Sequence, residues 1–209
     1  MRKKCDAYEN CVFINSPFDK KHIEFLYAVI FTIICCRKVP KLTLLDKDSS
    51  VTRLDKIKNL ISSSMFGIHD LSRCKSSKAR EYFRMNMPFE LGLDIGIKVF
   101  SEKHKNKNIL IVIDKKIDYK QAISDLSGND PLCYNGKAEN LVKIIRDWLV
   151  KCSGKRNILT SREIWASYED FLGWLKIERE DFKICLDNVE EYIDIVSEYL
   201  SKGQCLRTA

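Results

Sequence analysis

The sequence lacks a hydrophobic run long enough to cross a membrane. Its longest apolar stretch is residues 25–36, well short of the ~20 apolar residues that a spanning helix needs. The first residues are charged and lack the apolar core of a signal peptide. We therefore expect a cytoplasmic protein that makes no use of a membrane.

Metal and redox motifs are also missing. The nine cysteines show no Cys-x-x-Cys spacing, and the three histidines are far apart along the chain. Zinc sites combine cysteine and histidine at short, regular spacings. Cysteines inside apolar periodic stretches instead pack as small hydrophobic side chains. We expect reduced thiols, no metal and no cofactor.

The motifs of three large enzyme classes are absent. There is no Gly-rich dinucleotide fingerprint, no Walker-type lysine motif and no Gly-x-Ser-x-Gly elbow, which argues against dinucleotide-binding reductases, P-loop NTPases and α/β-hydrolases. The net charge of +7 is spread along the chain, and the densest basic cluster, Lys103 to Lys107, has no aromatic residue to stack on bases. We interpret that cluster as a solvated loop and expect no nucleic-acid partner.

Short apolar runs alternate along the chain with stretches of helical periodicity. Strands are predicted at residues 11–15, 42–45, 66–70, 109–114 and 131–134, and helices at 20–36, 53–63, 87–96 and 141–149. We expect Asp19 to cap the first helix. Strands that alternate with helices are joined by right-handed crossovers into a parallel sheet. The predicted fold is a doubly wound, flavodoxin-like α/β sheet of five parallel strands in the order 2-1-3-4-5.

The strand signals stop near residue 154. We predict an α/β domain over residues 1–154 and a helical C-terminal segment over 155–209 with two or three helices. The aromatic stripe of this segment is too large to leave in solvent. Its helices are therefore expected either to pack on the first domain or to form a homo-oligomer or bind a partner protein.

Polar side chains gather where the predicted strands end. Ligands of open parallel sheets bind outside the carboxyl ends of the strands. The residues expected to bind substrate there are Asn15, Ser16, Asp46, His69, Asn86 and Asp125, with Asp70 at the end of a central strand. Asp125 lies in the Gly- and Asx-rich segment 124–130, which is either a tight turn or a phosphate or ribose loop.

Glu90 is the candidate to which we give most weight. It lies early in an apolar helix between Phe89 and Leu91, and Gly92 lets a ligand or another backbone approach closely. The alternative is a structural glutamate in the first turn, which the helix dipole favours. A carboxylate in apolar surroundings at a ligand crevice can act as a nucleophile or stabilise a cationic sugar.

The segment 66–70, followed by Glu90-Leu91-Gly92 and the next strand, resembles the nucleoside 2-deoxyribosyltransferase family and its relatives, the TIR domains. The resemblance covers about residues 10–150. It implies that Glu90 attacks or stabilises the anomeric carbon as an N-glycosidic bond breaks, and that Asp70 contacts the sugar or base. The chain departs from the pattern because residues 84–89 replace the Asp-x-Gly-Thr approach and no Trp-Cys pair precedes Glu90.

A larger set of segments, residues 13–19, 53–57, 86–92 and 123–130, is similar to uncharacterised bacterial proteins associated with anti-phage defence. The resemblance thus implies an N-glycosidic-bond-cleaving enzyme acting on a nucleotide or nucleoside, with NAD or a deoxynucleoside as substrate, and a role as a defence effector. The alternative is a non-catalytic nucleotide-sensing or protein-interaction module of a defence complex. Both need a ligand crevice with acids and donors, so the sequence leaves both open.

Overall fold

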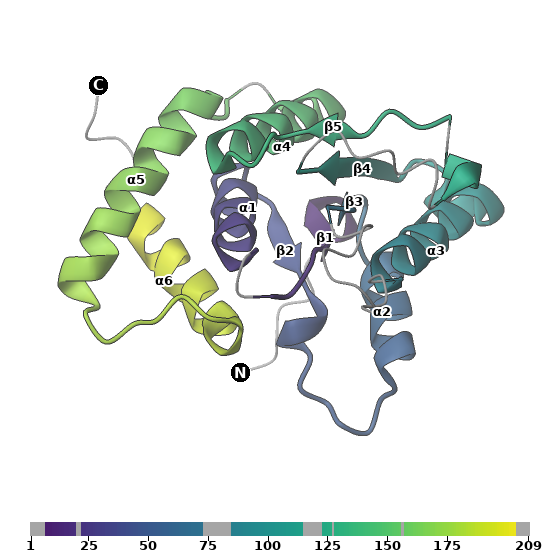
Figure 1. Cartoon of the computed structure of the whole chain (residues 1–209), viewed down its shortest axis with the longest axis horizontal. Coiled ribbons are helices and arrows are strands. Elements are labelled where there is room, and N and C mark those ends of the chain that lie inside the picture. The colour runs from purple at the N-terminus through teal and green to yellow at the C-terminus, as the bar shows by residue number, and fades with distance from the viewer. Residues whose placement is uncertain are drawn as a thin grey trace, which may run out of the picture. The chain divides into compact units, whose positions relative to one another are not determined.

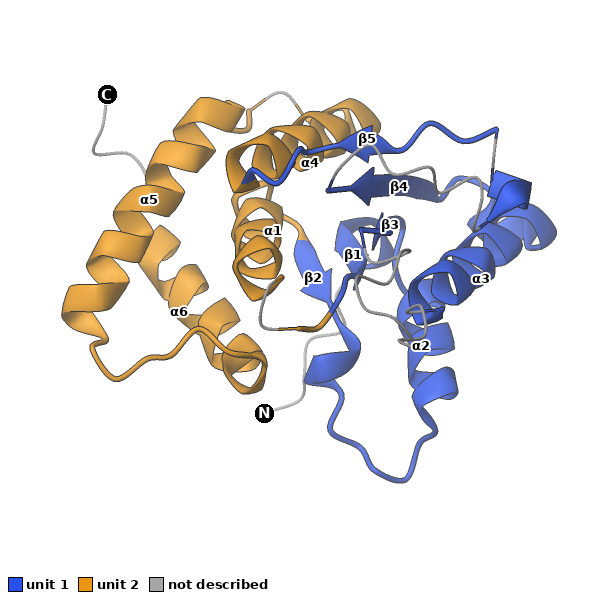
Figure 2. Cartoon of the chain, viewed as in Figure 1, with its two compact units in different colours: residues 1–17, 39–137 blue, residues 18–38, 138–209 orange. Residues whose placement is uncertain are grey.

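The computed structural model describes residues 7–19, 22–72, 85–114, 123–126, 128–155 and 157–203. The chain forms two compact units, residues 1–17 with 39–137 and residues 18–38 with 138–209 (Figure 2). These units are not consecutive segments, unlike the predicted division near residue 154, which stays a prediction. In the described part of the chain, no helix is both long and apolar enough to cross a membrane.

The first unit is built on a parallel sheet of five strands in the order β2-β1-β3-β4-β5 (Figure 1). The strands are β1 (Cys11–Asn15), β2 (Val39–Lys41), β3 (Phe66–Asp70), β4 (Asn108–Ile113) and β5 (Leu132–Cys133). Every residue of β1 and of β3 is buried, which accounts for their largely apolar sequences. The predicted α/β class and strand order are confirmed.

The second strand was predicted at the wrong place. Residues 42–45 have the apolar pattern of a strand, but Thr43–Leu45 form a 3₁₀ helix and β2 precedes them. Within the sheet β2 is an edge strand that pairs with β1 alone. An edge strand tolerates Pro40, because one side of it needs no ladder hydrogen bonds. Asp46 consequently follows a 3₁₀ turn and not a strand end.

Two helices cover one face of this sheet, α2 (Arg53–Ser62) and α3 (Asn86–Phe100). Phe13 of β1 packs against Ile57 of α2, and Met87 and Leu91 of α3 pack with Ile113 of β4. Alternate side chains of a strand point to the same face. The face under α2 and α3 is therefore the one that carries Phe13, Asn15, Gly67 and His69.

The second unit is helical. It consists of α1 (Ile23–Cys35), α4 (Ala138–Ser153), α5 (Ser161–Glu178) and α6 (Val189–Ser201). The ring of Phe31 in α1 contacts Tyr168 of α5 at a centroid distance of 5.2 Å, and Tyr27 lies 4.0 Å from Tyr192 of α6. The hydroxyl of Tyr192 also donates to the carbonyl of Tyr27 at 3.1 Å. The aromatic side chains of the C-terminal helices thus pack against α1, the first of the two arrangements predicted for them.

The start of α1 differs from the prediction. The helix begins at Ile23, its N-cap residue is His22, and no side chain caps it. Asp19 instead accepts a backbone hydrogen bond from the N–H of His22 through its carbonyl, at 3.0 Å. By contrast, α5 begins with a full capping box, in which Thr160 accepts from the N–H of Glu163 and the Glu163 side chain accepts from the Thr160 N–H.

Candidate functional site

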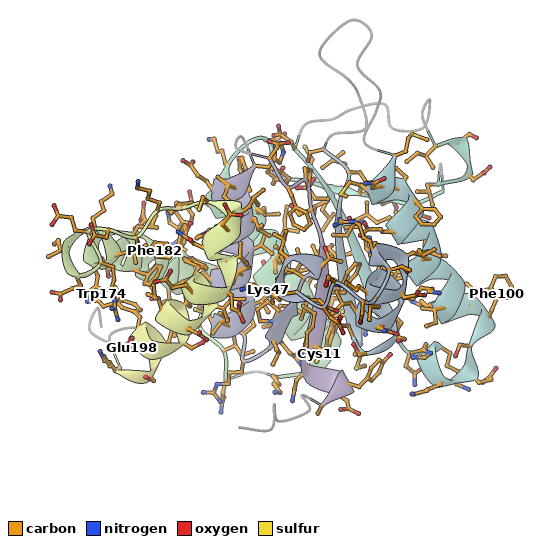
Figure 3. All side chains as sticks on the ribbon, turned by 90° about the horizontal axis from the view of Figure 1, so that it is seen from below. Cys11, Lys47, Phe100, Trp174, Phe182 and Glu198 are labelled. Carbon is orange, nitrogen blue, oxygen red and sulfur yellow. The ribbon has the colours of Figure 1, made fainter. Side chains whose placement is uncertain are left out.

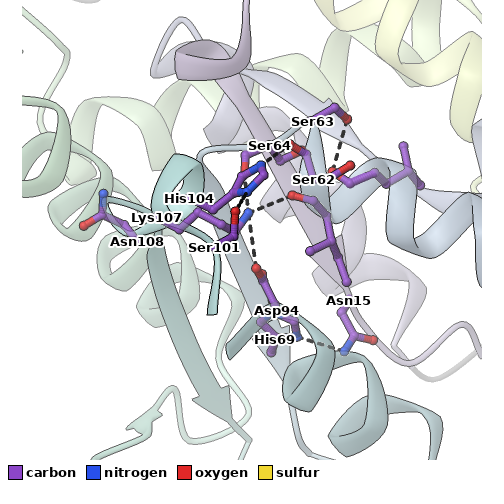
Figure 4. A network of polar contacts seen from close by, with 12 residues as sticks. Asn15, Ser62, Ser63, Ser64, His69, Asp94, Ser101, His104, Lys107 and Asn108 are labelled. Carbon is purple, nitrogen blue, oxygen red and sulfur yellow. Dashed lines mark hydrogen bonds and ion pairs between the residues drawn. The ribbon is translucent and has the colours of Figure 1, made fainter. Parts of the chain in front are cut away.

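The carboxyl ends of β1 and β3 are tied to the first turn of α3 by one asparagine. The Nδ2 group of Asn15 lies 3.0 Å from Nδ1 of His69 and donates to the carbonyl of Met87 at 2.9 Å (Figure 4). Asn15 is 1% exposed and His69 is fully buried. The three elements therefore meet at a single buried contact at this edge of the sheet.

His69 continues this contact into a buried ion pair. Its Nε2 lies 3.0 Å from Oδ2 of Asp94, and Nζ of Lys107 lies 3.2 Å from Oδ1 of the same carboxylate (Figure 4). Because Asn15 offers a donor to Nδ1, the partners assign the proton to Nε2. The lysine neutralises the charge of the aspartate, and neither side chain reaches solvent. Removing either partner would leave an uncompensated buried charge.

Lys107 also binds backbone carbonyl groups at the C-terminal end of α2. Its Nζ donates to the carbonyl of Ile61 at 2.8 Å and to that of Ser64, and His104 lies 3.0 Å from the carbonyl of Ser62 through Nε2. The last carbonyls of a helix have no partner within the helix, and cationic side chains there are favourable. Burial lowers the pKa of Lys107, while the Asp94 charge opposes that shift.

Sequence reasoning missed this pair. The basic cluster 103–107 was predicted as a solvated loop, which is wrong for Lys107, because that side chain is 1% exposed. Gly67 was missed as well. A Cβ atom there would lie 2.1 Å from Oδ2 of Asp94 and 3.1 Å from Nε2 of His69. The one available signal was the spacing of Asp94, seven residues after Met87 on the buried face of the helix.

Glu90 lies on that same buried face of α3, one turn before Asp94. Its side chain is 4% exposed. Burial raises its pKa from 4.5 to about 7, and the Arg53 charge only partly opposes the shift. Within the described residues no hydrogen bond or ion pair compensates the carboxylate. With a pKa of about 7, Glu90 is half protonated near neutral pH. When it is ionised, no hydrogen bond or ion pair with the described residues stabilises its negative charge.

Asn15 of β1 contacts the turn of α3 that precedes Glu90. Asn15 donates to the carbonyl of Met87, and residues three apart on a helix have Cβ atoms roughly 5–6 Å from each other. Both hydrogens of the Asn15 amide are used by its two acceptors. Its Oδ1 is buried and has no hydrogen-bond partner among the residues that the structure describes. A buried acceptor with spare capacity thus lies beside the turn that carries the buried carboxylate.

Asp70 belongs to a different cluster. It follows His69 in β3, so its side chain leaves the strand on the opposite face. Its Oδ1 accepts from the N–H of Ser72 at 2.9 Å and from the Ser72 hydroxyl, and its Oδ2 lies 3.3 Å from the hydroxyl of Tyr134. Burial and the Asp70 charge raise the pKa of Tyr134. The contacts of Asp70 therefore link the ends of β3 and β5, and its part in substrate binding stays a prediction.

The remaining predicted residues have separate surroundings. The side chain of Asp46 lies 3.3 Å from Nζ of Lys56, and Ser16 is buried at the end of β1. Asn86 is exposed at the start of α3, and Asp125 is exposed in the 3₁₀ helix Ser124–Leu126. None of the contacts found in the described ranges joins them to Glu90, so their roles in binding stay predictions.

The described residues hold no group of three or more His, Cys, Asp or Glu side chains placed to bind a metal ion. The cysteines among them are free thiols. No family model, curated protein or solved structure matches this chain. The resemblance to the deoxyribosyltransferase family therefore rests on its short sequence motifs alone.

Proposed function

We propose that this chain cleaves the N-glycosidic bond of a nucleotide or nucleoside, with NAD or a deoxynucleoside as substrate and Glu90 as the catalytic carboxylate. The observation that carries the proposal is Glu90 itself, a buried carboxylate with a pKa raised to about 7. It lies one helical turn after Met87, whose carbonyl binds Asn15, and Asn15 ends a strand at the side of the sheet where ligands of open α/β folds bind. A role in anti-phage defence is part of the proposal through the sequence resemblance alone.

The reaction requires the ionised form of Glu90. In the first step a carboxylate oxygen bonds to the anomeric carbon, and the carbon–nitrogen bond breaks with its electron pair leaving on the base. One water molecule then supplies the oxygen that replaces the carboxylate, and its proton goes to the base or to solvent. If the carboxylate stabilises the cationic sugar without bonding to it, the same water attacks directly and the balance is unchanged.

The free acceptor of Asn15 would hold the sugar. A buried polar atom without a partner is costly, and a hydroxyl group of a sugar can supply the missing donor. The two donated bonds of Asn15 to His69 and Met87 fix the direction of its Oδ1. The His69–Asp94 pair thus keeps the Asn15 amide oriented. The Glu90 carboxylate makes no hydrogen bond to the described residues, so it is available to interact with the anomeric carbon.

The test is release of free base from NAD and a panel of nucleosides by the purified full chain, followed by chromatography. Glu90→Gln should lower the rate by ~10²-fold or more, because it removes the charge that stabilises the transition state. Glu102→Gln makes the same chemical change at an exposed carboxylate whose side chain is 91% exposed, and it should leave the rate unchanged.

Two results would count against the proposal. If Glu90→Gln turned over a substrate at the wild-type rate, Glu90 would not be the catalytic group. If the native chain released no base but bound one of these compounds in a calorimeter, the nucleotide-sensing alternative would replace the enzyme. The two outcomes are distinct, because the first needs turnover and the second needs its absence.

A further inference from the structure

The outer face of α3 carries large apolar side chains that the described part of the chain leaves exposed. Four large side chains are exposed there, at 62% for Met85, 56% for Phe89, 65% for Val99 and 89% for Phe100. Figure 3 shows Phe100 projecting outward at the end of the helix. With 100° per residue, these side chains and two glycines fall within a stripe ~100° wide. We call this surface the outer stripe; it consists of Met85, Phe89, Gly92, Gly96, Val99 and Phe100.

The two glycines of the outer stripe are not required by the packing of the described residues. A Cβ atom added at Gly92 or at Gly96 would meet nothing within 4 Å. Glycine inside a helix is less stable than alanine, so two of them on an open face weaken α3 without any gain inside the molecule. What they allow is the close approach of another backbone at the middle of the stripe.

Four members of the outer stripe are spaced symmetrically about position 94 of the helix, while Met85 and Phe100 lie outside this symmetry. Phe89 lies five residues before that position and Val99 five after it, and the two glycines lie two residues on either side. An antiparallel pair of α3 helices related by a two-fold axis would place Phe89 against the partner's Val99 and Gly92 against the partner's Gly96. A two-fold interface uses the same surface on both subunits and needs such self-complementarity.

We propose that the outer stripe is a homodimer interface, formed by antiparallel packing of α3 against α3 of a second copy of this chain. An antiparallel pair also sets the positive end of each helix dipole beside the negative end of the other. Taking about 150–200 Å² for each of the four side chains, the lower part of the range that aromatic side chains bury, the exposed fractions correspond to roughly 400–550 Å² per copy. Two copies would bury about 1,000 Å², the lower limit of a specific interface. The dimer should therefore be reversible and depend on concentration.

The experiment is sedimentation of the full chain in the analytical ultracentrifuge, from about 1 to 200 µM. The wild type should shift from monomer to dimer across this range. The double variant Val99→Glu with Phe100→Glu should stay monomeric, because two charges would face the apolar side chains of the partner. Ile177→Glu is the matched control, since Ile177 is 78% exposed on α5, and it should dimerise like the wild type.

Gly92→Leu separates the interface from the stability of the helix. The exposed position has room within the chain, so the variant should keep or raise the melting temperature while weakening dimerisation at least about tenfold. A wild type that remains monomeric at every concentration would overturn the proposal and leave the outer stripe to a different protein. A dimer that persists in the double variant, or that Gly92→Leu strengthens, would overturn it as well.

Discussion

The raised pKa of Glu90 predicts a pH-dependent cost in stability, which can be measured without any substrate. The carboxyl has an ordinary pKa of 4.5 and a pKa of about 7 in the folded chain. Between these values the folded chain keeps a proton that the unfolded chain has lost, so the free energy of unfolding falls as the pH rises from 4.5 to 7. At 1.36 kcal/mol per pKa unit, the full loss above pH 7 is about 3 kcal/mol.

Glu90→Gln removes this cost, because an amide does not ionise. At pH 8 the variant should exceed the wild type by up to about 3 kcal/mol in free energy of unfolding, and at pH 5 by only about 1 kcal/mol. For a chain of this length the first figure corresponds to a melting temperature roughly 6–12 °C higher.

Thermal and urea unfolding at the two pH values, followed by circular dichroism, measure the difference directly. Glu102→Gln, at an exposed carboxylate, should show no such dependence on pH. A Glu90→Gln variant that gained nothing at pH 8, or that was destabilised there, would refute the reasoning. It would mean that the ionised carboxylate is compensated in the folded chain.

Two further predictions concern the buried pair of Asp94 and Lys107 and are checked by urea unfolding. Gly67→Ala should destabilise the chain by roughly 3–5 kcal/mol, because its Cβ would displace Asp94 from its partners. Gly92→Ala, which has open space around it, should stabilise the chain by ~0.5–1 kcal/mol. Equal urea midpoints for the two variants would contradict the steric argument. Lys107→Met should also cost about 3–5 kcal/mol by leaving Asp94 as an unpaired buried charge. The exposed Lys105→Met should change stability by less than ~0.5 kcal/mol, and a similar loss in both lysine variants would argue against the pair.

The strands that could be predicted to the residue are those whose sequence reflects full burial. Cys11–Asn15 and Phe66–Asp70 are short, mostly apolar runs, and the structure places β1 and β3 there. An edge strand lacks that signal. In β2, Val39–Lys41, a proline and a lysine replace the apolar run. The residues that follow have the apolar pattern of a strand, but they form a 3₁₀ helix. A strand that is buried on both faces can therefore be predicted from its sequence, whereas the position of this edge strand could not.

The candidate site shows the same limit. Asn15, His69 and Glu90 were predicted because polar residues at strand ends and a carboxylate in an apolar helix are local patterns. The pairing of Asp94 with Lys107 depends on which way two distant side chains point after folding, and no local pattern contains that. The opposite directions of His69 and Asp70 follow from strand geometry. They explain why two adjacent candidates lie in different clusters.

Release of base by the full chain, measured as a function of pH, tests most directly whether Glu90 is a catalytic carboxylate. With the most active of the tested substrates, the rate should rise about tenfold per pH unit up to pH 7 and level off above it, because only the ionised carboxylate reacts. At pH 8 Glu90→Gln should be slower by ~10²-fold or more and should lack this rise. Base release that is absent at every pH, or that follows the same profile in Glu90→Gln, would contradict the account.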